Sequence, residues 1–180
     1  MWSEGLSATG LAEHATHNKF NRMGKARNEM STTYVTGLLN GMLSAVSTVI
    51  PIPARNEKPL LVDAPIMNVE MGVLIGLAGQ IRGRFLLAGE PAVFGNVAEA
   101  MFGMRIEGEM LESFVGELGN MIGGTMCTNV SQDGVLLDIT PPTVFVGDIK
   151  LSGFRHALSV PVELETKGIL QLVLIVEEMP

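Results

Sequence analysis

The chain has 180 residues, of which 47% are hydrophobic and 17% charged, with a formal net charge of -7. This length and apolar content can bury the core of one compact domain and exclude a disordered chain. The negative net charge argues against binding to nucleic acid or to an anionic membrane surface, because both bind basic patches. Since no apolar run reaches the roughly eighteen residues of a membrane span, we expect a cytoplasmic protein without a membrane contact.

Residues 1–30 mix small, polar and charged side chains without sustained periodicity, so we expect a disordered N-terminal tail. His14 and His17 have a spacing that could serve a metal, but no further ligand completes a set, and no metal site is expected. The lone Cys127 cannot form an internal disulfide and is expected to be a small buried apolar residue.

The rest of the chain alternates between helical and strand patterns. Apolar residues recur at helical spacing from Thr32 to Ile50, and Pro51-Ile-Pro53 ends that helix. The other expected elements, in order, are a strand at Leu60–Met67, paired strands at Val69–Ala78 and Gln80–Ala88, a helix from Pro91 to Gly103, a helix at Glu109–Asn129, and strands at Val135–Ile139, Thr143–Val146, Lys150–Val162 and Ile169–Val176. This order predicts a single α/β domain of the α+β type over 31–180, with two long helices packed on an antiparallel sheet.

The helix predicted at Glu109–Asn129 has an apolar side and a side with little bulk. At about 100° per residue, the apolar side gathers Leu111, Phe114, Val115, Leu118, Met121 and Ile122, and the opposite side gathers Ser113, Gly116, Glu117, Asn120 and Gly124. Glu117 and Asn120 are three residues apart, so a carboxylate and an amide can reach one partner.

The glycines of this helix require a compensating interaction. Gly116, Gly119, Gly123 and Gly124 each cost about 1 kcal/mol relative to alanine. Close approach of another backbone or of a partner protein would offset that cost. The plainer alternative is a solvated polar face with the glycines packed against a neighbouring strand, and the residues alone favour it.

Three segments together carry a family resemblance. Gly116-Glu-Leu-Gly-Asn-Met121 follows a helix ending in Ala100-Met-Phe-Gly103 and precedes Asp138-Ile-Thr-Pro-Pro-Thr143. With Gly79-Gln-Ile-Arg-Gly-Arg-Phe85, these segments resemble the CheX branch of the CheC/CheX/FliY phosphatases of bacterial chemotaxis, over roughly residues 31–178. The family motif of Asp or Ser, three residues, Glu, two residues and Asn is met by Ser113, Glu117 and Asn120.

The resemblance implies an aspartyl-phosphate phosphatase whose substrate is the phosphoaspartate of a receiver domain such as CheY. Asn120 would orient the attacking water, since an amide both donates and accepts hydrogen bonds. Glu117 would pair with the lysine of the receiver, with Ser113, Gly116 and Gly124 at the contact. The Mg²⁺ would come from the receiver, so that this chain would need no cofactor of its own.

The resemblance also implies one active face per chain and a homodimer. Relatives of the CheC type carry the motif twice, but here the first helix has Asn40 with Gly37 where the glutamate should stand. CheX proteins resemble each other in forming homodimers through strands at a sheet edge. This chain has enough predicted strands to form such a dimer.

Two other function classes remain open. A non-catalytic module that binds receivers or flagellar switch proteins would have no need of both Glu117 and Asn120. An unrelated hydrolase could use paired carboxylates, but Glu112 and Glu117 lie five residues apart and point to different sides of a helix.

Overall fold

The computed structural model describes residues 32–63 and 66–178. The chain divides into two units, Met1–Thr36 and Gly37–Pro180, and the elements below belong to the second unit apart from residues 32–36. The tail expected at residues 1–30, with His14 and His17, lies outside the described residues.

Three helices occur in the described chain, close to their predicted positions. The first spans 32–49 and ends before Pro51, as expected. Helix α2 is Pro91–Phe102, with proline in its first turn, and ends at Gly103, whose positive φ of 72° suits a left-handed cap. Helix α3 is Glu109–Ser131, two residues longer than predicted.

The strands form one eight-stranded sheet in which every pairing is antiparallel, which confirms the predicted fold class. The order is β1-β7-β8-β4-β3-β5, with β2 also paired to β7 and β6 to β3. The strands are β1 Ala54–Asn56, β2 Leu60–Asp63, β3 Ile66–Gly79, β4 Arg82–Gly89, β5 Leu137–Ile139, β6 Thr143–Leu151, β7 His156–Leu164 and β8 Gly168–Glu178.

The prediction of one strand at Lys150–Val162 is wrong. Gly147 was expected to end the preceding strand, but β6 runs through it to Leu151, and the chain turns at 152–155 before β7. The pairing of β6 with β3 shifts register here, because Val69 pairs with Ile149 while Met71 pairs with Val146. Gly147 has a φ of 98°, so the glycine marks a bulge within a strand instead of a turn.

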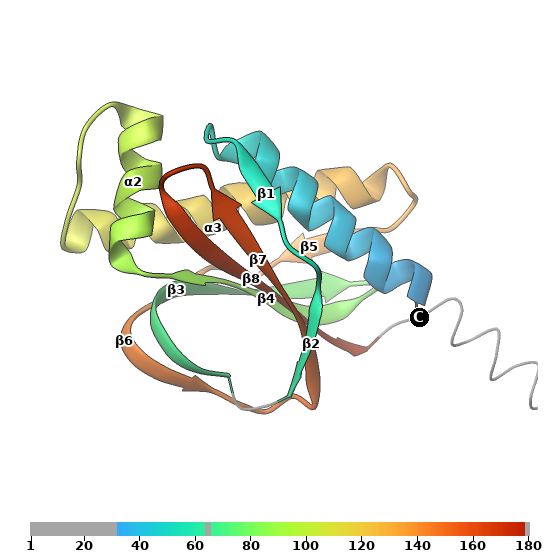
Figure 1. Cartoon of the computed structure of the whole chain (residues 1–180). Coiled ribbons are helices and arrows are strands. Elements are labelled where there is room, and N and C mark those ends of the chain that lie inside the picture. Colours follow the sequence, from blue (N-terminus) through green and yellow to red (C-terminus); the bar gives the residue numbers. More distant parts are fainter. Residues whose placement is uncertain (1–31, 64–65, 179–180) are drawn as a thin grey trace, which may run out of the picture. The chain divides into compact units, whose positions relative to one another are not determined.

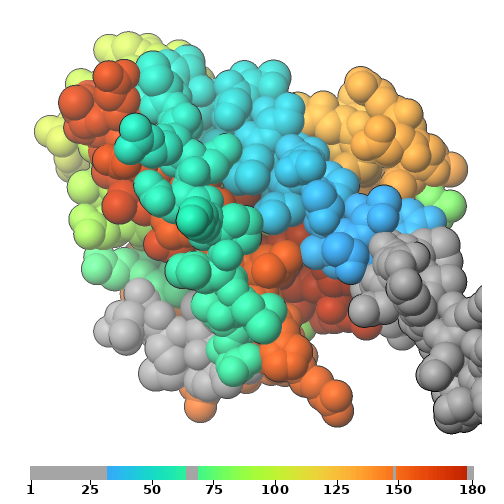
Figure 2. Space-filling model, turned by 45° about the vertical axis from the view of Figure 1, so that its right-hand side comes forward, coloured from blue at the N-terminus to red at the C-terminus, as the bar shows by residue number. Residues whose placement is uncertain are grey.

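The sheet buries apolar side chains on both faces. On one face lie the helix of residues 37–49 and α3, which run in opposite directions (Figure 1). They are in direct contact, since a Cβ on Gly41 would meet Val130 at 2.8 Å and the Asn129 side chain donates to the Gly41 carbonyl. In Figure 2 the outer surface of that helix is bordered by β1 and β2 on one side and by the turn that follows α3 on the other.

The other face of the sheet is covered by strands instead of helices. Its buried cluster comprises Val69, Leu86, Ala88, Ala157, Val173 and Ile175. Side chains of β2 and β6 pack against this cluster, among them Val62 and Phe145. Strands β3 and β6 curve away from the helices to reach it (Figure 1). The two faces therefore hold separate apolar layers, and only one of them supports the helices.

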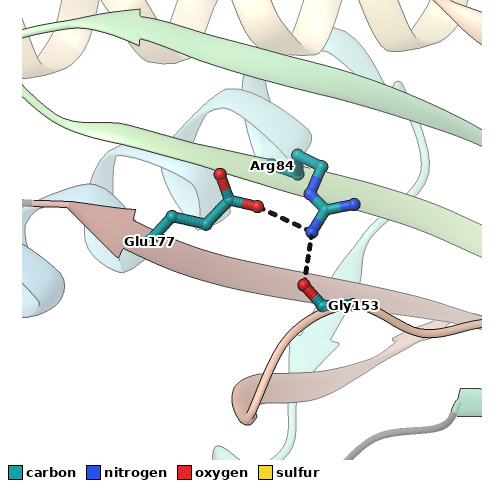
Figure 3. Close-up of polar contacts among 3 residues, drawn as sticks. All are labelled: Arg84, Gly153 and Glu177. Atoms are coloured by element: carbon teal, nitrogen blue, oxygen red, sulfur yellow. Dashed lines mark hydrogen bonds and ion pairs between the residues drawn. The ribbon is translucent and has the colours of Figure 1, made fainter.

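Arg84 on β4 links two parts of the second face (Figure 3). Its guanidinium Nη2 lies 2.6 Å from Glu177 Oε1 on β8 and donates to the Gly153 carbonyl in the β6–β7 turn at 3.3 Å. The charge pair joins β4 to β8, and the hydrogen bond to Gly153 holds the turn against the sheet.

Candidate functional site

Helix α3 presents one continuous exposed stripe to its surroundings. Positions that recur every three or four residues share one side of a helix. The exposed positions of α3 that fall on this side are Met110, Ser113, Glu117, Met121, Gly124 and Thr128. Leu118, Ile122 and Phe114 are buried, as predicted, with Leu118 and Ile122 turned away from the stripe and Phe114 beside its apolar edge. Among the described residues, the stripe is thus the side of α3 that stays exposed along most of the helix.

Three of the four glycines of α3 that were expected to need a compensating contact face the sheet. A Cβ on Gly119 would lie 2.7 Å from Val73 on β3, and one on Gly123 would lie 3.2 Å from Phe85 on β4. Gly116 is also buried, with Val144 of β6 at 3.1 Å. Its expected place on the exposed side is wrong, because β6 covers that edge of the helix. The plainer alternative, in which glycines pack against strands, holds for these three.

The contact of Gly116 joins two of the segments that carried the resemblance. Pro142 of the Asp138–Thr143 segment and Val144, which directly follows the segment, pack against Gly116 of α3. Thr140 fixes this segment to β3, because its backbone N–H donates to the Gly76 carbonyl and its hydroxyl accepts from the Gly76 N–H, both at 2.9 Å. The downstream segment therefore braces the helix directly beside the Glu117 turn.

Glu117 and Asn120 lie together on the outer side of α3. Glu117 is exposed and Asn120 is half-buried at the edge of the stripe. Neither side chain forms a hydrogen bond or an ion pair with any residue in 32–63 or 66–178. A carboxylate and an amide one helical turn apart, both without internal partners, are free to bind groups on another molecule.

The other two predicted contact residues also lie on the stripe. Ser113 is exposed, and its hydroxyl donates to the Glu109 carbonyl one turn back, at 2.9 Å. Gly124 is exposed and has open space where a Cβ would stand. Ser113, Glu117, Asn120 and Gly124 therefore form one surface, from which Gly116 is separated by its packing.

Sequence reasoning missed two apolar members of this surface. Met121 was expected on the buried side but is 39% exposed, and Met110, at 61%, was not singled out. Met121 sits at the boundary of the apolar arc, where the position of a neighbouring element decides burial. Met110 shares its side of the helix with Glu117, seven residues away, and that spacing could have identified it.

The first helix carries an amide without a carboxylate. Asn40 is exposed, and a Cβ on Gly37 would meet nothing within 4 Å. A glutamate would therefore fit at Gly37, so its absence has no steric cause. The described chain pairs glutamate with asparagine in the motif spacing on α3 alone.

Cys127 of α3 was expected to be buried, but it is only half-buried. Burial raises the pKa of its thiol, and the negative charge of Asp138 raises it further. A thiol held in the protonated form is a weak nucleophile. Cys127 is therefore not a candidate for covalent chemistry.

The described residues contain no group of three or more His, Cys, Asp and Glu placed to hold a metal ion. No helix among them is long and apolar enough to cross a membrane. A cavity of about 430 Å³ lies on the sheet face opposite the helices, lined by residues such as Val69, Leu86 and Val173. Glu117 and Asn120 do not line it, so the candidate site is a convex helix surface, which suits a macromolecule better than a small ligand.

Comparisons with known proteins agree on one family. The family model described as chemotaxis phosphatase CheX matches residues 71–162. A curated relative, the CheY-P phosphatase CheX of Thermotoga maritima, is 29% identical over 139 residues, which are 75% of this chain and 90% of the relative.

Two solved structures show the same fold. A CheC-like superfamily protein from Shewanella sp. PV-4 is 23% identical, covering 81% of this chain and 97% of that one, with a TM-score of 0.67. A chain of the CheX-CheY-BeF3-Mg²⁺ complex from Borrelia burgdorferi is 24% identical, covering 81% of this chain and 98% of that one, with a TM-score of 0.66.

Proposed function

Because the chain belongs to the chemotaxis phosphatase CheX family, we propose that it hydrolyses the phosphoaspartate of a CheY-like receiver domain. One observation supports this most: Glu117 and Asn120 are neighbours on the outer side of α3, without partners among the described residues, and lie inside the matched region. The relative from Thermotoga maritima is itself described as a CheY-P phosphatase.

Asn120 is the residue proposed to position the attacking water. Its side-chain carbonyl accepts a hydrogen bond from the water and its NH₂ group donates one, so that the water oxygen is held in line with the phosphorus. The water oxygen bonds to phosphorus as the bond from phosphorus to the aspartyl oxygen breaks. Inorganic phosphate leaves, and the receiver carboxylate is restored. This is catalysis by positioning, which matches a side chain that cannot titrate.

Glu117 is proposed to dock the two proteins. Its exposed carboxylate would pair with the lysine beside the phosphorylated aspartate of the receiver. Because Glu117 lies one turn before Asn120, that pair would fix the distance from the helix to the phosphoryl group. Ser113 and Gly124 would border the contact, and Gly116 would contribute by keeping α3 close to β6.

The positive charge needed at the phosphoryl group would come from the receiver, as its own Mg²⁺ and lysine. The related complex from Borrelia burgdorferi contains CheY, BeF3 and Mg²⁺. On this proposal the chain supplies no cofactor, works in the cytoplasm where its substrate is, and forms a homodimer through a sheet edge with the two α3 stripes accessible.

Phosphate release from a panel of phosphorylated receivers tests the proposal. The wild-type protein should accelerate release from at least one CheY-type receiver well above the rate of that receiver alone. A protein that binds the receiver bound to BeF3 and Mg²⁺ but leaves every rate unchanged would be a non-catalytic binding module.

A further inference from the structure

The exposed stripe of α3 carries large apolar side chains on either side of Glu117 along the helix, and the end of α2 adds another. Phe102, Met110 and Met121, here called the Phe102 patch, are 60%, 61% and 39% exposed. Large apolar side chains that are exposed on the same surface often mark a site that contacts another protein, because burying them there removes apolar area from water.

Two members of the Phe102 patch, Met110 and Met121, lie on one side of α3, and Phe114 of the same helix holds the third, Phe102, beside it. Phe114 of α3 is nearly buried and lies four residues after Met110 and seven before Met121, so all three share one side of the helix. The ring of Phe102, at the end of α2, meets Phe114 edge to face, with centroids 5.6 Å apart and planes at 77°. The corner between the two helices thus holds Phe102 in place beside the stripe.

The patch is continuous with the proposed catalytic face. Met121 follows Asn120 directly and lies one turn after Glu117, while Met110 lies two turns before Glu117. A molecule that contacts Glu117 and Asn120 therefore also covers the patch. The exposed carboxylates of Glu107, Glu109 and Glu117 lie on the same helix or in the turn just before it, and none of them forms an ion pair with a residue in the described parts of the chain.

We infer that the Phe102 patch is the apolar half of the receiver-docking surface, and that it binds an apolar area next to the basic group contacted by Glu117. The inference rests on the proposed function. Methionine and aromatic side chains are enriched at the centres of protein interfaces, and methionine adapts to differently shaped partners. The exposed carboxylates of Glu107, Glu109 and Glu117 favour a partner with positive charge beside that apolar area.

The test compares a Met110→Ser, Met121→Ser double variant with Leu136→Ser. Leu136 is 67% exposed but follows the far end of α3, so it matches the exposure without belonging to the patch. The probe is the CheY-type receiver that the wild type dephosphorylates fastest, activated with BeF3 and Mg²⁺. Affinity is measured by titration, and KM and kcat by phosphate release from the phosphorylated receiver.

The double variant should bind about tenfold or more weakly, as expected when apolar anchors are removed. It should raise KM while leaving kcat nearly unchanged, because the lost contact is the same in the bound and transition states. Leu136→Ser should match the wild type. Unchanged affinity in a folded double variant would overturn the inference while leaving the hydrolysis itself established. A double variant that becomes monomeric while keeping its affinity would also overturn it, by assigning the patch to a second copy of this chain.

Discussion

Gly119 of α3 lies so close to Val73 of β3 that a Cβ on the glycine would come within 2.7 Å of the valine Cγ1. Val73 is fully buried, so a methyl group added at Gly119 would have to displace packed core atoms. The contact seats α3 on the sheet at the turn that carries Glu117 and Asn120. The stability of this helix and the position of the candidate site therefore have the same origin.

Gly119→Ala should destabilise the protein. Adding a methyl group to this packed contact costs roughly 1–3 kcal/mol, of which the better helix propensity of alanine returns about 1 kcal/mol. Gly124→Ala is the matched control, because a Cβ there meets nothing within 4 Å, and it should raise the free energy of unfolding by up to about 1 kcal/mol. Urea unfolding of both variants checks the prediction, and equal effects of the same sign would contradict it.

The Arg84–Glu177 pair should stabilise the fold measurably. Its N–O distance is 2.6 Å, but the Glu177 side chain is 44% exposed, so water screens the pair and Glu177→Gln should cost at most about 1 kcal/mol. Asp63→Asn is the control, because its pair with His156 has side chains that are 77% and 62% exposed. Urea unfolding at low and high salt should show a salt-dependent loss for Glu177→Gln and almost none for Asp63→Asn.

Cys127 should titrate above its ordinary pKa of 9.0, because burial and then Asp138 disfavour the thiolate. The folded chain holds this proton more tightly than the unfolded chain. The contribution of Cys127 to stability is therefore full below the unfolded pKa and is lost as pH rises through the folded pKa. Iodoacetamide alkylation should follow a pH profile displaced upward in the native protein, and Asp138→Asn should move it partly back. Identical native and denatured profiles would contradict the assignment.

Much of the fold could be predicted because its signals are local. Pro51 ends the first helix and Pro91 begins α2, and both act through backbone geometry that the sequence shows directly. The prediction that a strand ends at Gly147 was wrong because a glycine in the sequence is equally compatible with a turn and with a bulge inside a strand. Only the pairing of β6 with the long β3 distinguishes the two.

The site shows the same division between local and tertiary signals. Helical spacing was enough to place Glu117 outside and Leu118 inside. Gly116 and Met121 lie at the two edges of the arc of α3 that is buried in the structure, and spacing alone does not decide where those edges fall. Strand β6 covers Gly116, and no described element covers Met121, so these residues exchanged the environments that the sequence predicted.

Glu117→Gln should weaken receiver binding as well as turnover. Removing the charge of an interfacial pair typically costs roughly 2 kcal/mol or more, which is about thirtyfold in Kd. Glu112→Gln is the control, because Glu112 is exposed on the same helix but points away from the stripe. Titration with the BeF3-activated receiver checks this. A Glu112→Gln variant that loses hydrolysis as fully as Glu117→Gln would favour a hydrolase with paired carboxylates.

The most direct measurement is the separation of binding from hydrolysis in Asn120→Ala. Affinity for the BeF3-activated receiver and the rate of phosphoaspartate loss at saturating protein are measured on the same preparation, with Asn40→Ala as a control for the loss of an exposed helical amide. If Asn120 positions the water, its variant should bind within about twofold of the wild type while hydrolysis falls to the receiver's own rate, and Asn40→Ala should behave as the wild type. An Asn120→Ala protein that still accelerates dephosphorylation fully would contradict the mechanism.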